Sequence, residues 1–215
     1  MNLTRLWPAV VFGVFLSLDA AGQTADCLAA EVNGQAITLS DLRIILAFGL
    51  EETDPESPEP KTPALVLDRL IDRKVVLELA QENVPVRPEE ADAFLGARVR
   101  ALGREEALKR LAEFGLEWSD LRAYIEEKIV FDKIISMRFS QAAVVSLKEM
   151  EDYYERTYLP AQRKLDNPPR PMMQVLGEIE QGIRAEKTMS RVKDWISGLR
   201  KQAEIRVHTD CLKKP

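Results

Sequence analysis

The stretch from residue 62 to residue 86, TPALVLDRLIDRKVVLELAQENVPV, constrains the fold more than any other part of the chain. Thr62 is a good N-cap and Pro63 suits the first helical position, so a helix is predicted to begin there. Its apolar residues occupy more than one face at a period of 3.6, which is typical of a helix contacted on several sides. Asn83 and Pro85 are predicted to end it, because a residue before proline leaves the α region. We therefore expect this helix at the centre of a helical domain.

The composition narrows the classes of protein to consider. The chain has 215 residues, of which 46% are hydrophobic and 30% are charged, so one medium domain or two small ones can form a real core. The net charge of -5 argues against a nucleic-acid binder, which would carry a basic patch. Long periodic segments favour helix over sheet.

The first residues have the pattern of an export signal. Arg5 supplies a positive n-region, and the apolar run LWPAVVFGVFLSL over residues 6–18 has the length of a signal-peptide h-region. Small residues at 20–22 predict cleavage near Gln23. The alternative, an uncleaved anchor, needs about 18 or more apolar residues. We predict a signal peptide at 1–22 and a periplasmic or otherwise exported protein, with no stable membrane insertion after cleavage.

Export affects the interpretation of the two cysteines. Cys27 and Cys211 lie at opposite ends of the mature chain, and exported proteins occupy compartments in which disulfides persist. A bond between them would close a loop of about 185 residues, for which the chain-entropy model gives roughly 5 kcal/mol. Two free thiols are the alternative. Because the sequence has no CxxC motif or Cys/His cluster, we expect no metal site, no redox catalysis and no cofactor.

The two ends of the chain are predicted to meet in a small sheet. Asn33-Gly34 between short β-compatible runs at 28–38 indicates a two-residue hairpin. The segment 203–208, AEIRVH, alternates with a period of two and is predicted to be a strand. Its only candidate partner is the hairpin, and antiparallel pairing would bring Cys27 near Cys211. The strand prediction and the disulfide prediction therefore support each other.

Helices are predicted between these ends. Ser40 is expected to cap the first, which should extend to about residue 50, and an acidic proline-rich loop follows at 51–63. Ser119 is expected to cap a long helix to about residue 139. One further helix is predicted to begin at Pro88, and another to cover 105–114 with Gly115 as its C-cap. A third is predicted to follow the capping box of Ser146 and Glu149. The last is predicted over 172–202, and a tail at 209–215 ends the chain.

This order of motifs resembles a known family. VNGQAITLSDL, ELAQENVPV, RPEEADAFL, FGLEWSDLRAYIEEKIVFDKIISMRF and VSLKEMEDYYE together are similar to the N-terminal chaperone region of SurA-type periplasmic proteins. That family includes PrsA and is related in fold to the C-terminal region of trigger factor. The resemblance covers about residues 29–155, and RAEKTMSRVKDWISGLRKQAEIRV looks like the family's closing helix and strand. It implies a mainly α-helical chaperone domain over 23–208, with a small antiparallel sheet joining the N-terminal hairpin to the C-terminal strand.

The chain departs from the family at one place. Many members carry a parvulin prolyl-isomerase module of roughly a hundred residues before the closing helix, far more than the short segment 156–171 provides here. Parvulin sites in the family also use paired histidines, whereas this chain has only His208, which we expect to be structural. The isomerase module is therefore predicted to be absent.

Two groups of residues are candidate sites. Catalysis by paired carboxylates is disfavoured, because most of the 35 acidic residues lie near Lys or Arg at helical spacing, as Glu105 does with Lys109. The second group flanks the proline-rich break and suits adaptable binding of apolar clients. Its alternative role is to pack the last helix onto the core. The group comprises Tyr153, Tyr154, Tyr158, Met172 and Met173.

The sequence and the resemblance together predict a holdase-type chaperone or assembly factor. Its partners would be unfolded or partly folded client polypeptides, with outer-membrane proteins among the candidates, and it would use neither ATP nor covalent chemistry. Two alternatives stay open at this point: a prolyl isomerase with an unrecognised site, and an adaptor for one fixed partner. A homodimer is also left open.

Overall fold

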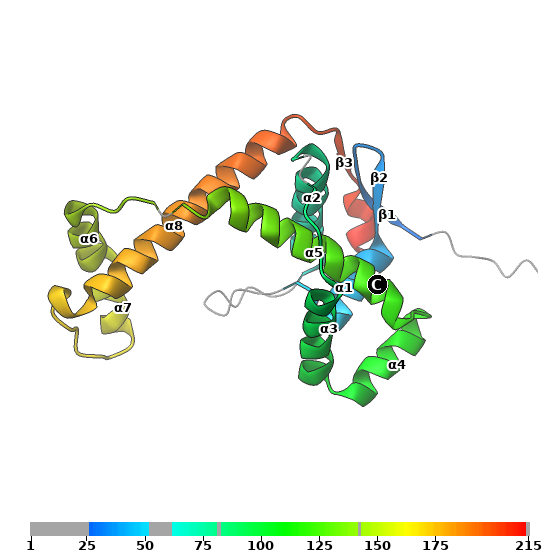
Figure 1. Ribbon diagram of the computed structural model, residues 1–215, viewed down its shortest axis with the longest axis horizontal. Coiled ribbons are helices and arrows are strands. Elements are labelled where there is room, and N and C mark those ends of the chain that lie inside the picture. Colours follow the sequence, from blue (N-terminus) through cyan, green and yellow to red (C-terminus); the bar gives the residue numbers. More distant parts are fainter. Residues whose placement is uncertain (1–25, 52–61, 81–82, 142, 214–215) are drawn as a thin grey trace, which may run out of the picture.

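The computed structural model describes residues 26–51, 62–80, 83–141 and 143–213. The predicted signal peptide and most of the predicted acidic loop lie outside the described residues. The rest is mainly helical, with one small antiparallel sheet of strand order β2-β1-β3, so the predicted fold class is confirmed (Figure 1).

The sheet joins the two ends of the described chain as predicted. Strands β1 (Leu28–Val32) and β2 (Gln35–Thr38) form a hairpin whose turn residues Asn33 and Gly34 have φ angles of 48° and 84°. Strand β3 (Ile205–Val207) pairs antiparallel with the other edge of β1. The short 3-10 helix η2 (Thr209–Lys213) follows, and a disulfide joins Cys27 to Cys211 with a Cα–Cα distance of 5.8 Å.

Helix α2 (Pro63–Leu79) is the centre of the main body, and it contacts β1, α1, α5 and α8. The Thr62 hydroxyl accepts a hydrogen bond from the backbone N–H of Leu65 at 3.2 Å, which confirms the predicted N-cap. The helix ends earlier than predicted, at Leu79, well before Asn83. Its buried residues lie on several sides and are Val66, Leu67, Leu70, Ile71, Arg73, Val75 and Val76.

Two of the predicted caps were each wrong by two residues. Helix α1 (Leu39–Phe48) is capped by Thr38 rather than Ser40, because Thr38 ends β2 and forms a capping box with Asp41. Helix α5 (Trp118–Phe139) is capped by Glu117 in place of Ser119.

Helices α3 (Pro88–Leu102) and α4 (Arg104–Phe114) complete the body. Gly103 separates them with φ 85°, and Gly115 ends α4 in the left-handed region as expected. On α4, Lys109 forms an ion pair with Glu113 at 3.7 Å rather than with Glu105, which lies at the same spacing on its other side.

A distal lobe lies at the other end of the molecule (Figure 1). It contains α6 (Leu147–Tyr153), the π-helix η1 (Tyr154–Tyr158), α7 (Leu159–Lys164) and the first half of α8 (Met172–Arg200). The Ser146–Glu149 capping box is confirmed. Helix α7 was not predicted. It continues η1 without a break and contains Pro160 near its start.

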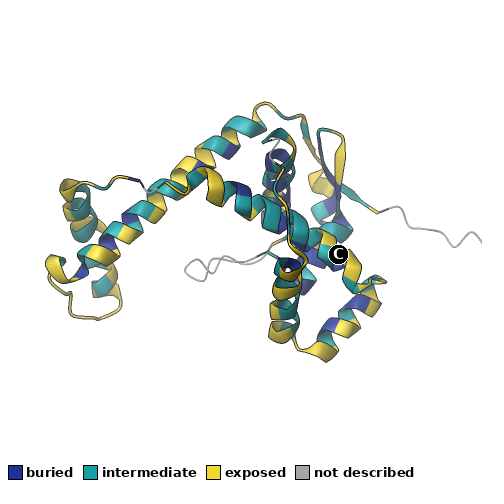
Figure 2. Cartoon of the chain, viewed as in Figure 1, coloured by how far each residue is buried: buried dark blue, intermediate teal, exposed yellow. Residues whose placement is uncertain are grey.

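The buried residues form three apolar clusters. The first joins the sheet to α1, α2 and α5, where most fully buried positions lie (Figure 2). The second lies where α8 crosses α5 and α2, and the third holds the distal lobe to α8. Helix α8 is therefore a long arm that belongs to the lobe at one end and to the body at the other.

Candidate functional site

An apolar groove of about 720 Å³ lies between α5 and α8. Phe131 and Ile135 line it from α5, and Met189, Val192 and Ile196 line it from α8. Asp132, Ser136, Gln181, Arg184, Ala185 and Thr188 complete the lining. We call this hollow the α5–α8 groove.

The groove forms because each helix carries an apolar stripe that extends past their crossing. At the crossing, Ile134 is fully buried and Val192 and Ile196 are 9% and 8% exposed. Beyond it, Ile135 is only half-buried and Met189 is 67% exposed. An exposed methionine beside half-buried apolar residues provides a surface that can adapt to differently shaped apolar groups.

A second groove adjoins the first along α8. It has a volume of about 380 Å³ and shares Met189, Val192 and Ile196 with the α5–α8 groove, but its other wall is α2. The stripe on α8 therefore borders a hollow on each side, and Met189 stands between them.

Arg200 fixes the C-terminal end of α8 against α2. Its Nε donates to Asp72 Oδ1 at 2.5 Å, and its Nη2 donates to Asp68 at 2.7 Å to the carboxylate and 2.8 Å to the carbonyl. Burial raises the pKa of the Asp72 carboxyl, and the Arg200 charge works against that rise. These bonds hold the angle at which α8 leaves the body.

Most charged side chains on the rim of the α5–α8 groove are neutralised within their own helix. Lys128 donates to Asp132 at 2.6 Å on α5, and Arg184 donates to Glu180 at 2.5 Å on α8. Both are i,i+4 pairs. The polar rim is therefore largely self-satisfied, and the surface left for a partner is the apolar floor.

Two aromatic rings and two arginines lie beside the groove, and we call them the arginine–aromatic cluster. The rings of Phe139 and Trp195 meet edge to face at 5.6 Å. The guanidinium of Arg138 lies 4.6 Å from the Trp195 centroid, and that of Arg191 lies 5.7 Å from the Phe139 centroid. Both rings pack on the same second apolar cluster as Ile135, so this cluster is continuous with the groove.

The five residues predicted from the sequence to bind clients are brought together, but at the distal end of α8. Tyr153, Tyr154, Tyr158 and Met172 are half-buried against the third apolar cluster. The rings of Tyr154 and Tyr158 stack at 5.4 Å. Met173 is 79% exposed. Four of the five thus have the packing contacts that the sequence analysis offered as their alternative role, and a part in client binding stays a prediction.

The α5–α8 groove was missed by sequence reasoning. Its signal is present as apolar residues at helical spacing, Phe131 and Ile135 on α5 and Met189, Val192 and Ile196 on α8. Such a stripe looks the same in sequence whether another helix covers it or not. Only the crossing angle of α5 and α8 decides which part stays exposed.

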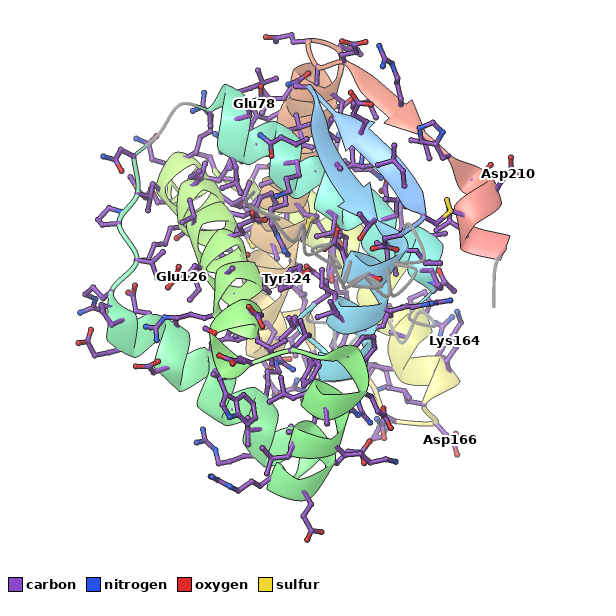
Figure 3. All side chains as sticks on the ribbon, turned by 90° about the vertical axis from the view of Figure 1, so that its right-hand side faces the viewer. Glu78, Tyr124, Glu126, Lys164, Asp166 and Asp210 are labelled. Carbon is purple, nitrogen blue, oxygen red and sulfur yellow. A yellow bond between two sulfur atoms is a disulfide. The ribbon has the colours of Figure 1, made fainter. Side chains whose placement is uncertain are left out.

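A more polar groove of about 440 Å³ lies between β2, α1, α2 and α5. There the Tyr124 hydroxyl donates to Asp41 Oδ1 at 2.6 Å, and Lys74 pairs with Glu127 at 2.7 Å. Figure 3 shows Tyr124 between α5 and the hairpin. Burial, followed by the bond to Asp41, raises the pKa of Tyr124, so its proton is held more firmly than in a free tyrosine. The arrangement ties α1 to α5.

The described residues offer little other candidate chemistry. Among them, no three His, Cys, Asp or Glu side chains come together in a way that could hold a metal ion. His208 follows β3 with an exposed side chain, and its backbone N–H donates to the carbonyl of Ala29 at 2.8 Å. None of the helices in the described part combines the length and the apolar character that spanning a bilayer needs.

Comparison with known proteins gives one informative similarity, and no family model matches the chain. The chain is 28% identical over 140 residues to the Chaperone SurA of Nitrosospira multiformis. The match covers 62% of this chain and 32% of that protein. The similarity supports a relationship to SurA-like chaperones. The chain matches about a third of the length of that curated relative.

Proposed function

We propose that this protein is an exported, holdase-type chaperone that binds apolar segments of unfolded or partly folded clients in the α5–α8 groove. The observation that carries the proposal is the open groove with its exposed Met189. The similarity to a protein named Chaperone SurA supports the same class of function.

The dimensions of the groove suit reversible binding of short segments. A volume of about 720 Å³ takes a few apolar side chains. Burying each one contributes roughly 1.5–3 kcal/mol, and ordering the client offsets part of that gain. The resulting affinity is modest, so a client can leave and fold without ATP or covalent chemistry.

The proposed location is the periplasm. The predicted signal peptide supports export, and the disulfide between Cys27 and Cys211 is of the kind that persists in oxidising compartments. Residues 156–171 form the end of η1, α7 and a short connection. Many family members carry an isomerase module at this position, and the proposed chaperone acts without one.

The decisive experiment measures light scattering of a denatured outer-membrane protein diluted into the oxidised, mature protein. Wild type is expected to suppress aggregation near stoichiometric ratios, and Met189→Asp is expected to lose most of that effect, because a carboxylate is costly to bury with an apolar client. Leu108→Asp is the matched control, since Leu108 is an exposed apolar residue of α4 outside the groove. Met173→Asp tests the distal lobe in the same way.

Three results would contradict the proposal. Full activity of Met189→Asp with loss in Met173→Asp would place the site on the distal lobe. No suppression by wild type, together with co-purification of one stoichiometric protein, would indicate the single-partner adaptor. Turnover of a prolyl-peptide substrate above background would indicate the isomerase.

A further inference from the structure

Strand β3 forms one edge of the sheet, and only its inner side is paired. The strand order is β2-β1-β3, so β3 pairs with β1 on one side. In the part of the chain that the structure describes, no strand pairs with its other side. Figure 3 shows β3 as the outermost strand, on the side of the labelled Asp210. We call this side the β3 edge.

The bonds that join β3 to β1 determine which backbone groups face the β3 edge. The carbonyl of Glu204 accepts from β1's end of the hairpin, and the N–H of His208 donates to the first turn of the same chain segment, both at 2.8 Å. Hydrogen-bonded and non-hydrogen-bonded pairs alternate along an antiparallel ladder. Arg206, midway between these two residues, therefore also bonds to β1. Ile205 and Val207 direct their N–H and C=O groups away from β1, toward the β3 edge.

The opposite edge of the sheet, on β2, is less open. Gln35 follows the two-residue turn and bonds to β1, so the alternation directs the backbone groups of Ala36 and Thr38 outward. The Thr38 N–H is already used, because it donates to Asp41 Oδ2 at 2.7 Å and Thr38 caps α1. Two successive outward-facing residues with unused N–H groups are therefore a feature of the β3 edge.

The geometry of the β3 edge defines the ligand that fits it. Ile205 and Val207 lie two residues apart, so their donors and acceptors repeat at about 7 Å, which is the repeat of any extended polypeptide. Val207 is 47% exposed on one face of the strand. Arg206 lies on the other face, where it pairs with Glu204 and Glu31. The favourable cross-strand neighbours are therefore an apolar residue beside Val207 and a polar one beside Arg206.

A second copy of this chain fits the β3 edge less well than a client does. The antiparallel register that uses Ile205 and Val207 of both copies centres on Arg206. It places the two Arg206 side chains directly opposite each other, and like charges in that position are destabilising. An extended client segment has no such constraint on its sequence.

We propose that the β3 edge binds an extended client segment as an added strand of the sheet, through the backbone groups of Ile205 and Val207. Segments that alternate apolar and polar residues are preferred. This inference rests on the proposed function and names a second contact for the client besides the α5–α8 groove. Recognition through the backbone admits many sequences. A three-residue strand makes few hydrogen bonds, each of modest net value, so the client can leave again.

The test uses a fluorescent peptide of alternating valine and threonine with N-methyl groups on every second residue, which leaves it a single hydrogen-bonding edge. Binding to the oxidised, mature protein is followed by anisotropy, and NMR then measures amide hydrogen exchange. With the peptide at about ten times its Kd, exchange at Ile205 and Val207 should slow about tenfold, because only the free fraction exchanges. The amides of Arg206 and His208 bond to β1 and should exchange slowly with and without the peptide.

Variants of Val207 separate its backbone from its side chain. Val207→Pro removes the outward N–H, and an edge strand tolerates proline where the N–H faces solvent. The Kd of the peptide should rise about fivefold, the value of one hydrogen bond. Val207→Thr is the matched control, since it keeps the N–H and the β-branched shape and should bind like the wild type. Circular dichroism and an intact disulfide check the fold of both variants.

The outcomes distinguish this inference from the function on which it rests. Unchanged exchange at Ile205 and Val207 with peptide bound would overturn the β3-edge inference and leave the holdase intact. Equal affinity of Val207→Pro and wild type would overturn it as well. Slow exchange at both residues without peptide, increasing with protein concentration, would overturn it because a second copy would then occupy the edge. Failure of the wild type to suppress aggregation in the light-scattering assay would contradict the holdase itself.

Discussion

Removing the Cys27–Cys211 disulfide should lower the free energy of unfolding by about 5 kcal/mol. The two cysteines are separated by 184 residues, and the chain-entropy relation for a loop of this length gives that value at 25 °C. The Cα–Cα distance of 5.8 Å is typical of unstrained bridges, and the pairing of β1 with β3 does not depend on the sulfur atoms. The effect should therefore act mainly through the unfolded chain.

The assay is urea unfolding of the mature protein with and without reductant, beside a Cys27→Ala/Cys211→Ala variant. With a slope of roughly 2 kcal/mol/M, a loss of that size moves the midpoint down by about 2.5 M. Trp118 at the start of α5 and Trp195 in the arm are both half-buried, so fluorescence reports on the body and the arm together. Circular dichroism supplies a second probe of the same transition.

The double variant is the control, since reductant should leave its midpoint unchanged. The reasoning would be refuted by a shift below about 0.5 M between oxidised and reduced wild type. Such a result would mean that the reduced, unfolded chain keeps its ends close together, so that the bond removes little entropy. Cys211 belongs to η2, so the disulfide is found in Figure 3 near the labelled Asp210.

Two further predictions concern ion pairs. Arg73 is 3% exposed and pairs with Glu51, so Arg73→Met should destabilise the fold by about 3 kcal/mol, because it leaves a carboxylate with little access to water. Adding Glu51→Gln should recover most of the loss in a double-mutant cycle, and an additive result would contradict the pairing. Lys187, with the backbone and hydroxyl of Ser146, lowers the pKa of Glu149 to about 2. The stability that Glu149 contributes should therefore be complete above its unfolded pKa of about 4.5 and disappear as the pH falls toward 2. Lys187→Ala should raise the pKa in an NMR titration, and an unchanged value would show that the Ser146 bonds suffice.

The predictable part of this fold is the part that local chemistry determines. The Asn33-Gly34 turn and the Thr62-Pro63 helix start depend on the backbone preferences of adjacent residues, and both were confirmed. The alternation of apolar and polar residues at 203–208 predicted β3. The pairing of this strand with the N-terminal hairpin then predicted that Cys27 and Cys211 lie close together. These features need no knowledge of how helices cross.

The unpredicted part depends on tertiary geometry. Thr38 and Ser40 are both good N-caps, and the end of β2 selects Thr38. The π-helix η1 and the short helix α7 have no distinctive sequence pattern beyond Pro160. The α5–α8 groove is the strongest case, since an apolar stripe becomes a binding surface only where its neighbour stops covering it.

The fold also explains why the chain does not bury Met189 by itself. Helix α8 is held at its C-terminal end by Arg200, by β3 and by the disulfide, and at its other end by the apolar packing of the distal lobe. Between these ends, Lys187 donates to the carbonyl of Val144 at 2.8 Å, which fixes α8 to the connection that follows α5. Because α8 is fixed at these three points, it could close over the groove only by losing one of these sets of contacts. An open apolar groove is therefore compatible with a stable protein, and its remaining apolar contacts are left for another chain to make.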